Sequence, residues 1–104
     1  MVVTTERKKI EILIDRPLMK RLRQLAKDVE ISGYTVFNAI GGEGGQGRWR
    51  DDQVTGGAGS KILFVSILDQ EKAGEFLAAL EPLLDEYGLR VSISTVEVIR
   101  ADRF

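Results

Sequence analysis

The chain contains no cysteine and no histidine among its 104 residues. Without cysteine it can form no disulfide, no thiol nucleophile and no thiolate metal site. Without histidine it lacks the commonest general base and the commonest zinc ligand, which excludes a hydrolytic triad. An acid–base enzyme would have to rely on Asp, Glu, Lys or Tyr alone. These absences favour a function that is not catalytic.

A charge excess and long apolar runs are also absent. The chain has 15 basic and 16 acidic residues and a net charge of -1, which does not predict a nucleic-acid partner. No run of 18 apolar residues predicts a transmembrane helix, and the opening "MVVTTERKK" lacks the apolar stretch of a signal peptide. The length fits a single domain over residues 1–104, and we expect a cytoplasmic location with at most peripheral membrane contact through a partner.

Hydrophobic periodicity predicts six elements in the order β-α-β-β-α-β. Alternation predicts strands over residues 8–14 and 89–99, and the apolar side of the last strand switches after Ile93. β-Branched and aromatic residues predict a strand over residues 34–40, and a continuous apolar run predicts one over residues 61–68. Helical spacing predicts a helix that starts near Pro17 and stops at "SGY", and a second that starts at a cap on Asp69 and stops at Gly88. Pro82 should kink the second helix or end its regular part. The order predicts a ferredoxin-like α+β fold, a four-stranded antiparallel sheet with two helices on one face.

Residues 61–68 are apolar on both sides of the predicted strand. Ile62, Phe64 and Leu68 lie on one side, and Leu63, Val65 and Ile67 lie on the other. A strand of this kind is usually covered on both faces. Other copies of the chain could supply the second cover as a homo-oligomer; the alternative is a face with a few exposed aliphatic side chains.

Residues 41–60 hold eight of the 11 glycines and the single tryptophan. They connect neighbouring strands, for which two to five residues normally suffice. A flexible linker is one interpretation, but Arg48, Trp49 and Arg50 replace the serines of a linker. Glycine lets backbone N–H groups approach an anion, and arginine suits a phosphate or carboxylate, so anion binding is the other interpretation. Lys61 could add an anion contact or be a solvated strand end.

The stretch "GYTVFNAIGGEGGQGR", residues 33–48, resembles the second strand and glycine-rich loop base of PII signalling proteins and their PII-like relatives. The closest likeness is to the PII-like group associated with carboxysomes and bicarbonate transport. The resemblance implies a homotrimer with adenine-nucleotide sites in the clefts between subunits. It also implies a non-enzymatic sensor whose T-loop, about residues 41–60, signals to a protein partner such as a transporter or carboxysome-related enzyme.

The resemblance also implies a set of ligand-binding residues. The ligands would be ADP or AMP, with cyclic AMP or bicarbonate as further candidates, and no catalytic cofactor or metal. The junction at Gly88 is too short for the phosphate loop of classical PII proteins, which favours AMP or ADP over ATP. Arg100 and Arg103 could reach a neighbouring cleft or belong to a frayed terminus. The candidates are Gly33, Tyr34, Thr35, Gly41, Gly42, Gly44, Gly45, Gly47, Arg48, Arg50, Lys61, Gly88, Arg100 and Arg103.

Three other classes share the predicted fold. A phosphate-handling enzyme of the acylphosphatase type needs an Arg and an Asn beside a phosphate loop, but only "DRP" follows the first strand. A metal-binding domain would have oxygen ligands alone, without convincing spacing. An RNA-recognition domain would need central aromatics and a basic surface.

Overall fold

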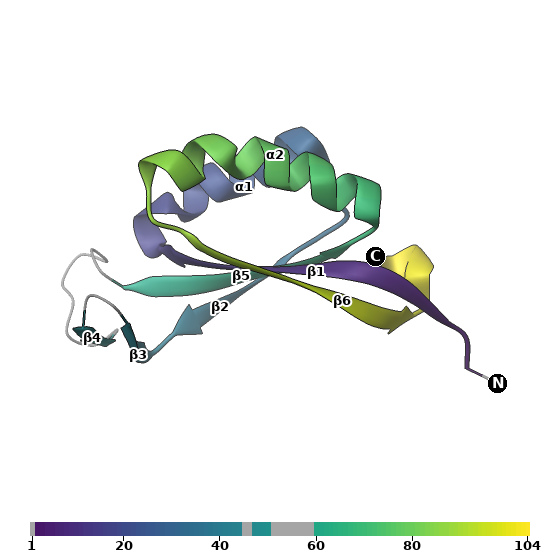
Figure 1. Ribbon diagram of the computed structural model, residues 1–104, viewed down its shortest axis with the longest axis horizontal. Helices are drawn as coiled ribbons and strands as arrows, with labels where there is room; N and C mark the ends of the chain where they lie inside the picture. The colour runs from purple at the N-terminus through teal and green to yellow at the C-terminus, as the bar shows by residue number, and fades with distance from the viewer. Residues whose placement is uncertain (1, 45–46, 51–59) are drawn as a thin grey trace.

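The computed structural model describes residues 2–44, 47–50 and 60–104. Its main body is a four-stranded sheet with the strand order β2-β5-β1-β6, in which all neighbours are antiparallel. Both helices lie on one face of this sheet (Figure 1). The predicted ferredoxin-like arrangement is therefore confirmed. The elements are β1 (Thr4–Asp15), the 3₁₀ turn η1 (Arg16–Leu18), α1 (Met19–Val29), β2 (Thr35–Ala39), β3 (Gly41–Gly44), β4 (Gly47–Arg50), β5 (Lys61–Leu68), α2 (Gln70–Glu86), β6 (Arg90–Ile99) and the 3₁₀ turn η3 (Ala101–Arg103).

The hydrophobic core lies between the helices and the sheet. It is built from alternate residues of the two central strands and from one stripe of each helix, as the periodicity predicts. Burial of this apolar surface is the main stabilising contribution to the fold. The fully buried members are Ile10, Ile12 and Ile14 of β1, Ile62, Phe64 and Leu68 of β5, Leu22 and Ala26 of α1, and Ala73, Phe76, Leu80 and Leu83 of α2.

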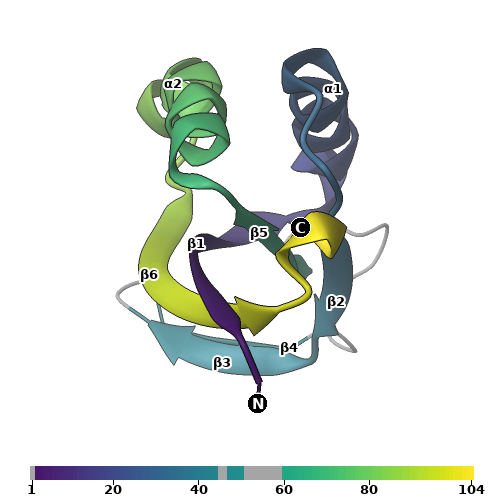
Figure 2. The ribbon, with the colours of Figure 1, turned by 90° about the vertical axis from the view of Figure 1, so that its right-hand side faces the viewer.

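The opposite face of the sheet, called the open face here, is also apolar at its centre. Leu63 of β5 pairs with Leu13 on one side and with Phe37 on the other, and paired residues point to the same face. Val65 and Ile67 continue the row along β5. Figure 2 shows both helices on the far side of the sheet from this surface. The prediction that residues 61–68 are apolar on both sides is confirmed.

The first helical segment starts near Pro17 as predicted, with Asp15 at the N-cap position, but its first turn is 3₁₀ and its end differs from the prediction. Pro17 lies in η1, and the α-helix begins only at Met19. The helix ends at Glu30, before "SGY", with Glu30 in the left-handed conformation at φ 62°. The N–H groups of Glu30 and Ile31 donate to the carbonyls of Lys27 and Ala26, the paired bonds of a Schellman motif. A glutamate takes the position that glycine usually occupies.

The second helix passes through Pro82. It continues to Glu86, so of the two predicted effects of Pro82 the end of the regular helix is wrong, and the kink stays a prediction. Pro82 is exposed, and its ring and missing donor therefore lie away from the core. Tyr87 ends the helix in an extended conformation, and Gly88 does not adopt a left-handed φ. The expected glycine stop is therefore wrong in its geometry, although its position is close.

Part of the segment 41–60 is a small hairpin. β3 and β4 pair antiparallel, with Gly41 opposite Arg50 and Glu43 opposite Arg48. The segment was predicted as an open loop because its glycines give no alternating pattern. Residues 45–46 and 51–59 of this segment lie outside the described residues. Within the part of the chain that is described, no helix is long and apolar enough to cross a membrane.

Candidate functional site

A groove of about 170 Å³ lies at the start of β2, beside the C-terminal turn. Gly33, Tyr34 and Thr35 line it from the segment that enters β2. Arg103 lines it from the end of the chain, and Figure 2 shows the C-terminal turn beside β2. The structure thus brings together four of the candidate residues from the sequence. The other lining residues are Ser32, Val65, Ser66, Ile67 and Phe104.

Contacts with the core fix the wall of this groove. The hydroxyl of Ser66, which is buried, donates to the carbonyl of Gly33 at 2.6 Å. The ring of Tyr34 stacks on Phe64 at 4.8 Å between centroids, and Phe64 stacks on Phe76 at 5.8 Å. Tyr34 remains 41% exposed. It therefore presents part of a rigidly supported aromatic ring to the groove.

The two candidate arginines of the C-terminus have different positions. Arg100 ends β6 in the left-handed conformation at φ 61°, which turns the chain into η3. Arg103 follows on this turn, and its N–H donates to the carbonyl of Arg100 at 2.9 Å. Arg103 lines the groove, whereas Arg100 does not.

The remaining candidates lie near the other end of β2. Five residues of strand separate the two regions by about 17 Å. Gly41, Gly42 and Gly44 belong to β3, and the backbones of Gly47, Arg48 and Arg50 belong to β4. Gly45 lies outside the described residues. Gly88 lies at the junction between α2 and β6, where a methyl group would meet open space.

Arg16 joins the two stems of the 41–60 segment. Its Nη2 donates to Oδ1 of Asn38 at 2.6 Å, just before the segment, and its Nε donates to Oγ of Ser60 at 3.2 Å, just after it. Its backbone N–H also donates to the carbonyl of Ser60 at 2.9 Å. The role of Arg16 could not be predicted from the sequence, because its contacts span 22 and 44 positions and no local pattern indicates them.

The contacts of Arg16 with Asn38 and Ser60 are called the Arg16 clamp here. Lys61 follows Ser60 directly in the chain. Its ammonium group contacts Oδ1 of Asp15 at 2.6 Å, and the two residues are opposite each other in the β1–β5 register. The structure therefore gives Lys61 an ion pair at the stem of the segment. An anionic ligand at Lys61 would therefore have to compete with the carboxylate of Asp15.

Arg90 is a second residue that sequence reasoning missed. Its guanidinium lies so close to Gly44 that a Cβ at position 44 would be 2.8 Å from Nη2. Arg90 begins β6, so it places a cation against the base of the glycine-rich segment. The signal available in the sequence was an arginine directly after the short Gly88 junction. Among the described residues, no group of three or more acidic residues could hold a metal ion.

A comparison with protein-family profiles decides the family. The profile of the nitrogen regulatory protein P-II family matches residues 7–103. The chain belongs to the P-II family. No curated protein sequence matches the chain. The resemblance predicted from residues 33–48 is thus confirmed over nearly the whole length.

Solved structures of P-II relatives share the fold. The PII-like protein CPII from Thiomonas intermedia K12, bound to ADP, AMP and bicarbonate, has a TM-score of 0.89 at 19% identity, covering 100% of this chain and 98% of CPII. A candidate PII-like signalling protein from Thermus thermophilus has a TM-score of 0.81 at 25% identity, covering 97% of each chain. The GlnK–ATP complex of B. subtilis is more distant, with a TM-score of 0.62 at 12% identity, covering 88% of this chain and 82% of GlnK.

Proposed function

We propose that this P-II family protein is a non-enzymatic sensor that binds ADP or AMP, with bicarbonate as a further ligand. The observation that carries the proposal is the groove in which Gly33, Tyr34, Thr35 and Arg103 meet. The similar fold of CPII, which has been solved with ADP, AMP and bicarbonate, supports the same ligand class. The ligand state would reach a protein partner, a transporter or enzyme of inorganic-carbon metabolism, through residues 41–60.

The chemistry of the groove suits a nucleotide. Tyr34 offers an aromatic surface, and Val65 and Ile67 offer apolar contacts for a base. Arg103 offers a planar set of N–H donors that matches a phosphate or a bicarbonate. Arg90, near the other end of β2, would reach a second anionic group at Gly44.

A single copy supplies an incomplete site. The groove of about 170 Å³ is smaller than the 300–1,000 Å³ of typical ligand pockets, so we propose that a neighbouring copy completes it. The open face supports assembly, because neither helix covers its apolar centre in the described part of one copy. Nε of Arg7, on the same face, is buried without a hydrogen-bond partner, and a second copy could provide an acceptor. A homotrimer is the assembly we propose.

The position of the clamp supports signalling through residues 41–60. Arg16 ties both stems to the end of β1, and Arg90 contacts the base of β3. An anion near Gly44 would bind Arg90 and so change the contact between Arg90 and the base of the 41–60 segment. A ligand-dependent change in the order of the segment would then change its affinity for the partner.

Isothermal titration with ADP and AMP tests the proposal, with and without bicarbonate. We expect about one site per subunit, and we expect Arg103→Gln to weaken binding about tenfold or more, because it removes a charged hydrogen bond. Arg21→Gln is the control, since it removes the same charge from α1, where Arg21 contacts Glu86 and does not line the groove. If the protein binds no adenine nucleotide under any of these conditions, the proposal is wrong.

The enzymatic alternative has its own test. Arg16 and Asn38 are the residue types that an acylphosphatase-like site would need, but they bond to each other at 2.6 Å. The connection that carries Arg16 is a 3₁₀ turn without glycine. We expect acetyl phosphate and ADP to remain intact when incubated with the protein. Hydrolysis that disappears in Arg16→Ala would favour the enzyme instead.

A further inference from the structure

A second and larger groove of about 430 Å³ lies on the outer side of α1, against the segment that leads into β2. Its rim carries Lys20, Arg23 and Lys27, which recur on α1 at the spacing i, i+3 and i+7. Residues at this spacing share one face of a helix. Seven residues of α-helix rise about 10 Å, so the three cations form a line of about that length.

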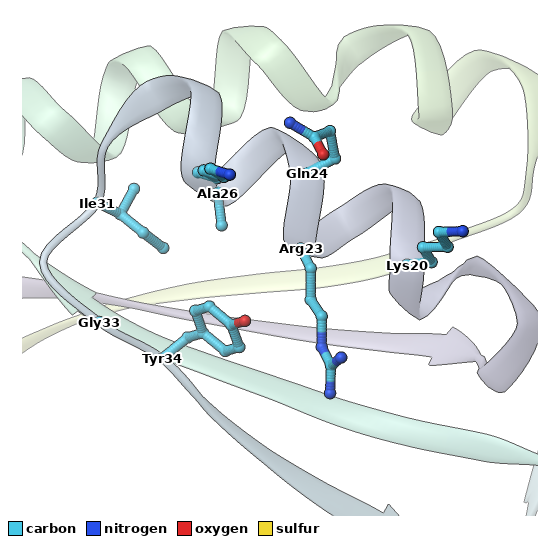
Figure 3. Close-up of a pocket in the computed structure, with 8 residues that line it drawn as sticks. Lys20, Arg23, Gln24, Ala26, Ile31, Gly33 and Tyr34 are labelled. Carbon is cyan, nitrogen blue, oxygen red and sulfur yellow. The ribbon is translucent and has the colours of Figure 1, made fainter.

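The floor of this groove is apolar and aromatic. Ala26 is buried, Ile31 is half-buried, and the partly exposed ring of Tyr34 lies at the side nearest the sheet. In Figure 3 the side chain of Arg23 extends from α1 toward the sheet, beside that ring. A tyrosine and an arginine next to each other are the residue types that contribute most to binding at protein interfaces.

The three cations are not neutralised within the described residues. None of them belongs to an ion pair there, and no acidic side chain lines the groove. Arg21, on the side of the same helix that faces α2, differs: it contacts Glu86 at 3.7 Å and donates to the hydroxyl of Tyr87 at 3.0 Å. The positive charge of the groove is therefore available to a ligand.

We propose that this groove docks an acidic segment of a partner protein that carries an apolar or aromatic side chain between its carboxylates. The cations are exposed and spread over about 10 Å, which suits successive carboxylates along a chain better than one compact anion. The apolar floor would receive the side chain between them. This docking surface is separate from residues 41–60. It shares Gly33 and Tyr34 with the groove of the proposed nucleotide site, but its three cations all belong to α1.

The neighbouring helix argues against a long polyanion or an anionic membrane as the ligand. The exposed side of α2 is acidic, and it would repel any negatively charged surface that extended across both helices. A short acidic segment would contact α1 alone. The exposed carboxylates of α2 are Glu71, Glu75, Glu81, Asp85 and Glu86.

The test uses fluorescence anisotropy with the whole chain and no nucleotide. The probe is a short fluorescein-labelled peptide of glutamates with one central phenylalanine. We expect saturable binding that falls about threefold to fivefold in Arg23→Gln and about tenfold or more in Arg23→Gln/Lys27→Gln. Arg21→Gln removes the same charge from the same helix on the other side, and we expect less than a twofold change. The same peptide with glutamine in place of glutamate should not bind.

Three results would overturn this proposal. They are the absence of binding by the glutamate peptide, an equal loss in Arg21→Gln and Arg23→Gln, and tighter Arg23-dependent binding of single-stranded DNA or phosphatidylglycerol vesicles than of the peptide. ADP titration of Arg23→Gln separates the two proposals. A variant that binds ADP like the wild type but loses the peptide has lost only the α1 surface.

Discussion

At the scale of single residues, Arg16 shows how one side chain can organise a long insertion. Its guanidinium contacts Asn38 before the 41–60 segment and Ser60 after it. One acceptor, on Asn38, lies in strand β2, and the other, on Ser60, lies just before strand β5. The planar guanidinium of arginine can bond to both at once. The segment therefore leaves the sheet and returns to it through a fixed pair of stems.

Replacement of Arg16 tests this clamp. We expect Arg16→Ala to lower the free energy of unfolding by about 1–2 kcal/mol, because two side-chain hydrogen bonds are lost. Arg16→Lys should recover only part of this loss, since an ammonium group cannot span both acceptors in the same way. Urea unfolding measures both variants. Arg23→Ala is the control, because Arg23 is exposed and has no ion pair among the described residues, and it should change stability by less than about 0.5 kcal/mol. An unchanged midpoint in Arg16→Lys would show that charge alone holds the stems.

Several residues of the candidate site could be predicted from local sequence, and others could not. Gly33, Tyr34 and Thr35 belong to a contiguous motif, and the structure gathers them in one groove. The choice of Arg103 over Arg100 depends on a left-handed turn at Arg100, which the sequence does not indicate because the residue is not glycine. Arg90 is significant only through its contact with Gly44, which folding creates.

At the scale of elements, periodic residues gave accurate predictions and glycine-rich residues did not. The strand over residues 61–68 has the predicted bounds, because its run of apolar residues, most of them β-branched or aromatic, favours a strand in any register. The β3–β4 hairpin was missed, because glycines carry no side-chain pattern and a two-stranded hairpin has little stability of its own. The helix end at Glu30 was also missed, because backbone hydrogen bonds, and no preferred residue type, define it there.

The end of α1 leads to a prediction about stability. Glu30 adopts a left-handed φ that glycine takes without steric cost, so Glu30→Gly should raise the free energy of unfolding by about 0.5–1 kcal/mol. Asp28→Gly is the matched control, because it removes the same charge from inside the helix. There we expect a loss of about 0.5–1 kcal/mol.

Thermal or urea unfolding of the two glycine variants gives the comparison directly. A destabilised Glu30→Gly would mean that the carboxylate of Glu30 contributes more than the backbone strain costs. Lys72 of α2 donates to the carbonyl of Val29 at 3.0 Å, a contact that does not use the side chain of Glu30 or of Asp28. The hydrogen bond and charge of Glu75, together with the charges of Glu30 and Asp69, raise the pKa of Lys72 above its ordinary value.

At the scale of the whole molecule, the sheet has one face covered by both helices and one apolar face that no helix of the described residues covers. Phe37, on the edge strand β2, is 52% exposed on the open face. Ile93, on the opposite edge strand β6, is 51% exposed on the helix side, opposite Ile10. The two residues are therefore a matched pair that differs in the face of the sheet.

This pair tests the proposed assembly. We expect the wild type to sediment as a trimer at micromolar concentration and Phe37→Asp to shift it toward the monomer, because a charge would enter an apolar interface. Ile93→Asp should leave the assembly intact. Analytical ultracentrifugation measures both, and circular dichroism checks that each variant is folded. A monomeric wild type, or equal dissociation in both variants, would contradict assembly through the open face.

Tyr34 lies between two grooves, because it lines both the groove with Arg103 and the groove on α1. The binding free energies of two ligands that both contact Tyr34 can be linked through this side chain, whatever the distance between the charges of the ligands. If a nucleotide moves the ring and changes the affinity for an acidic segment by some factor, that segment changes the affinity for the nucleotide by the same factor. Tyr34 stacks on Phe64, which stacks on Phe76, and this packing limits how far the ring of Tyr34 can move. It therefore also limits how large that factor can be.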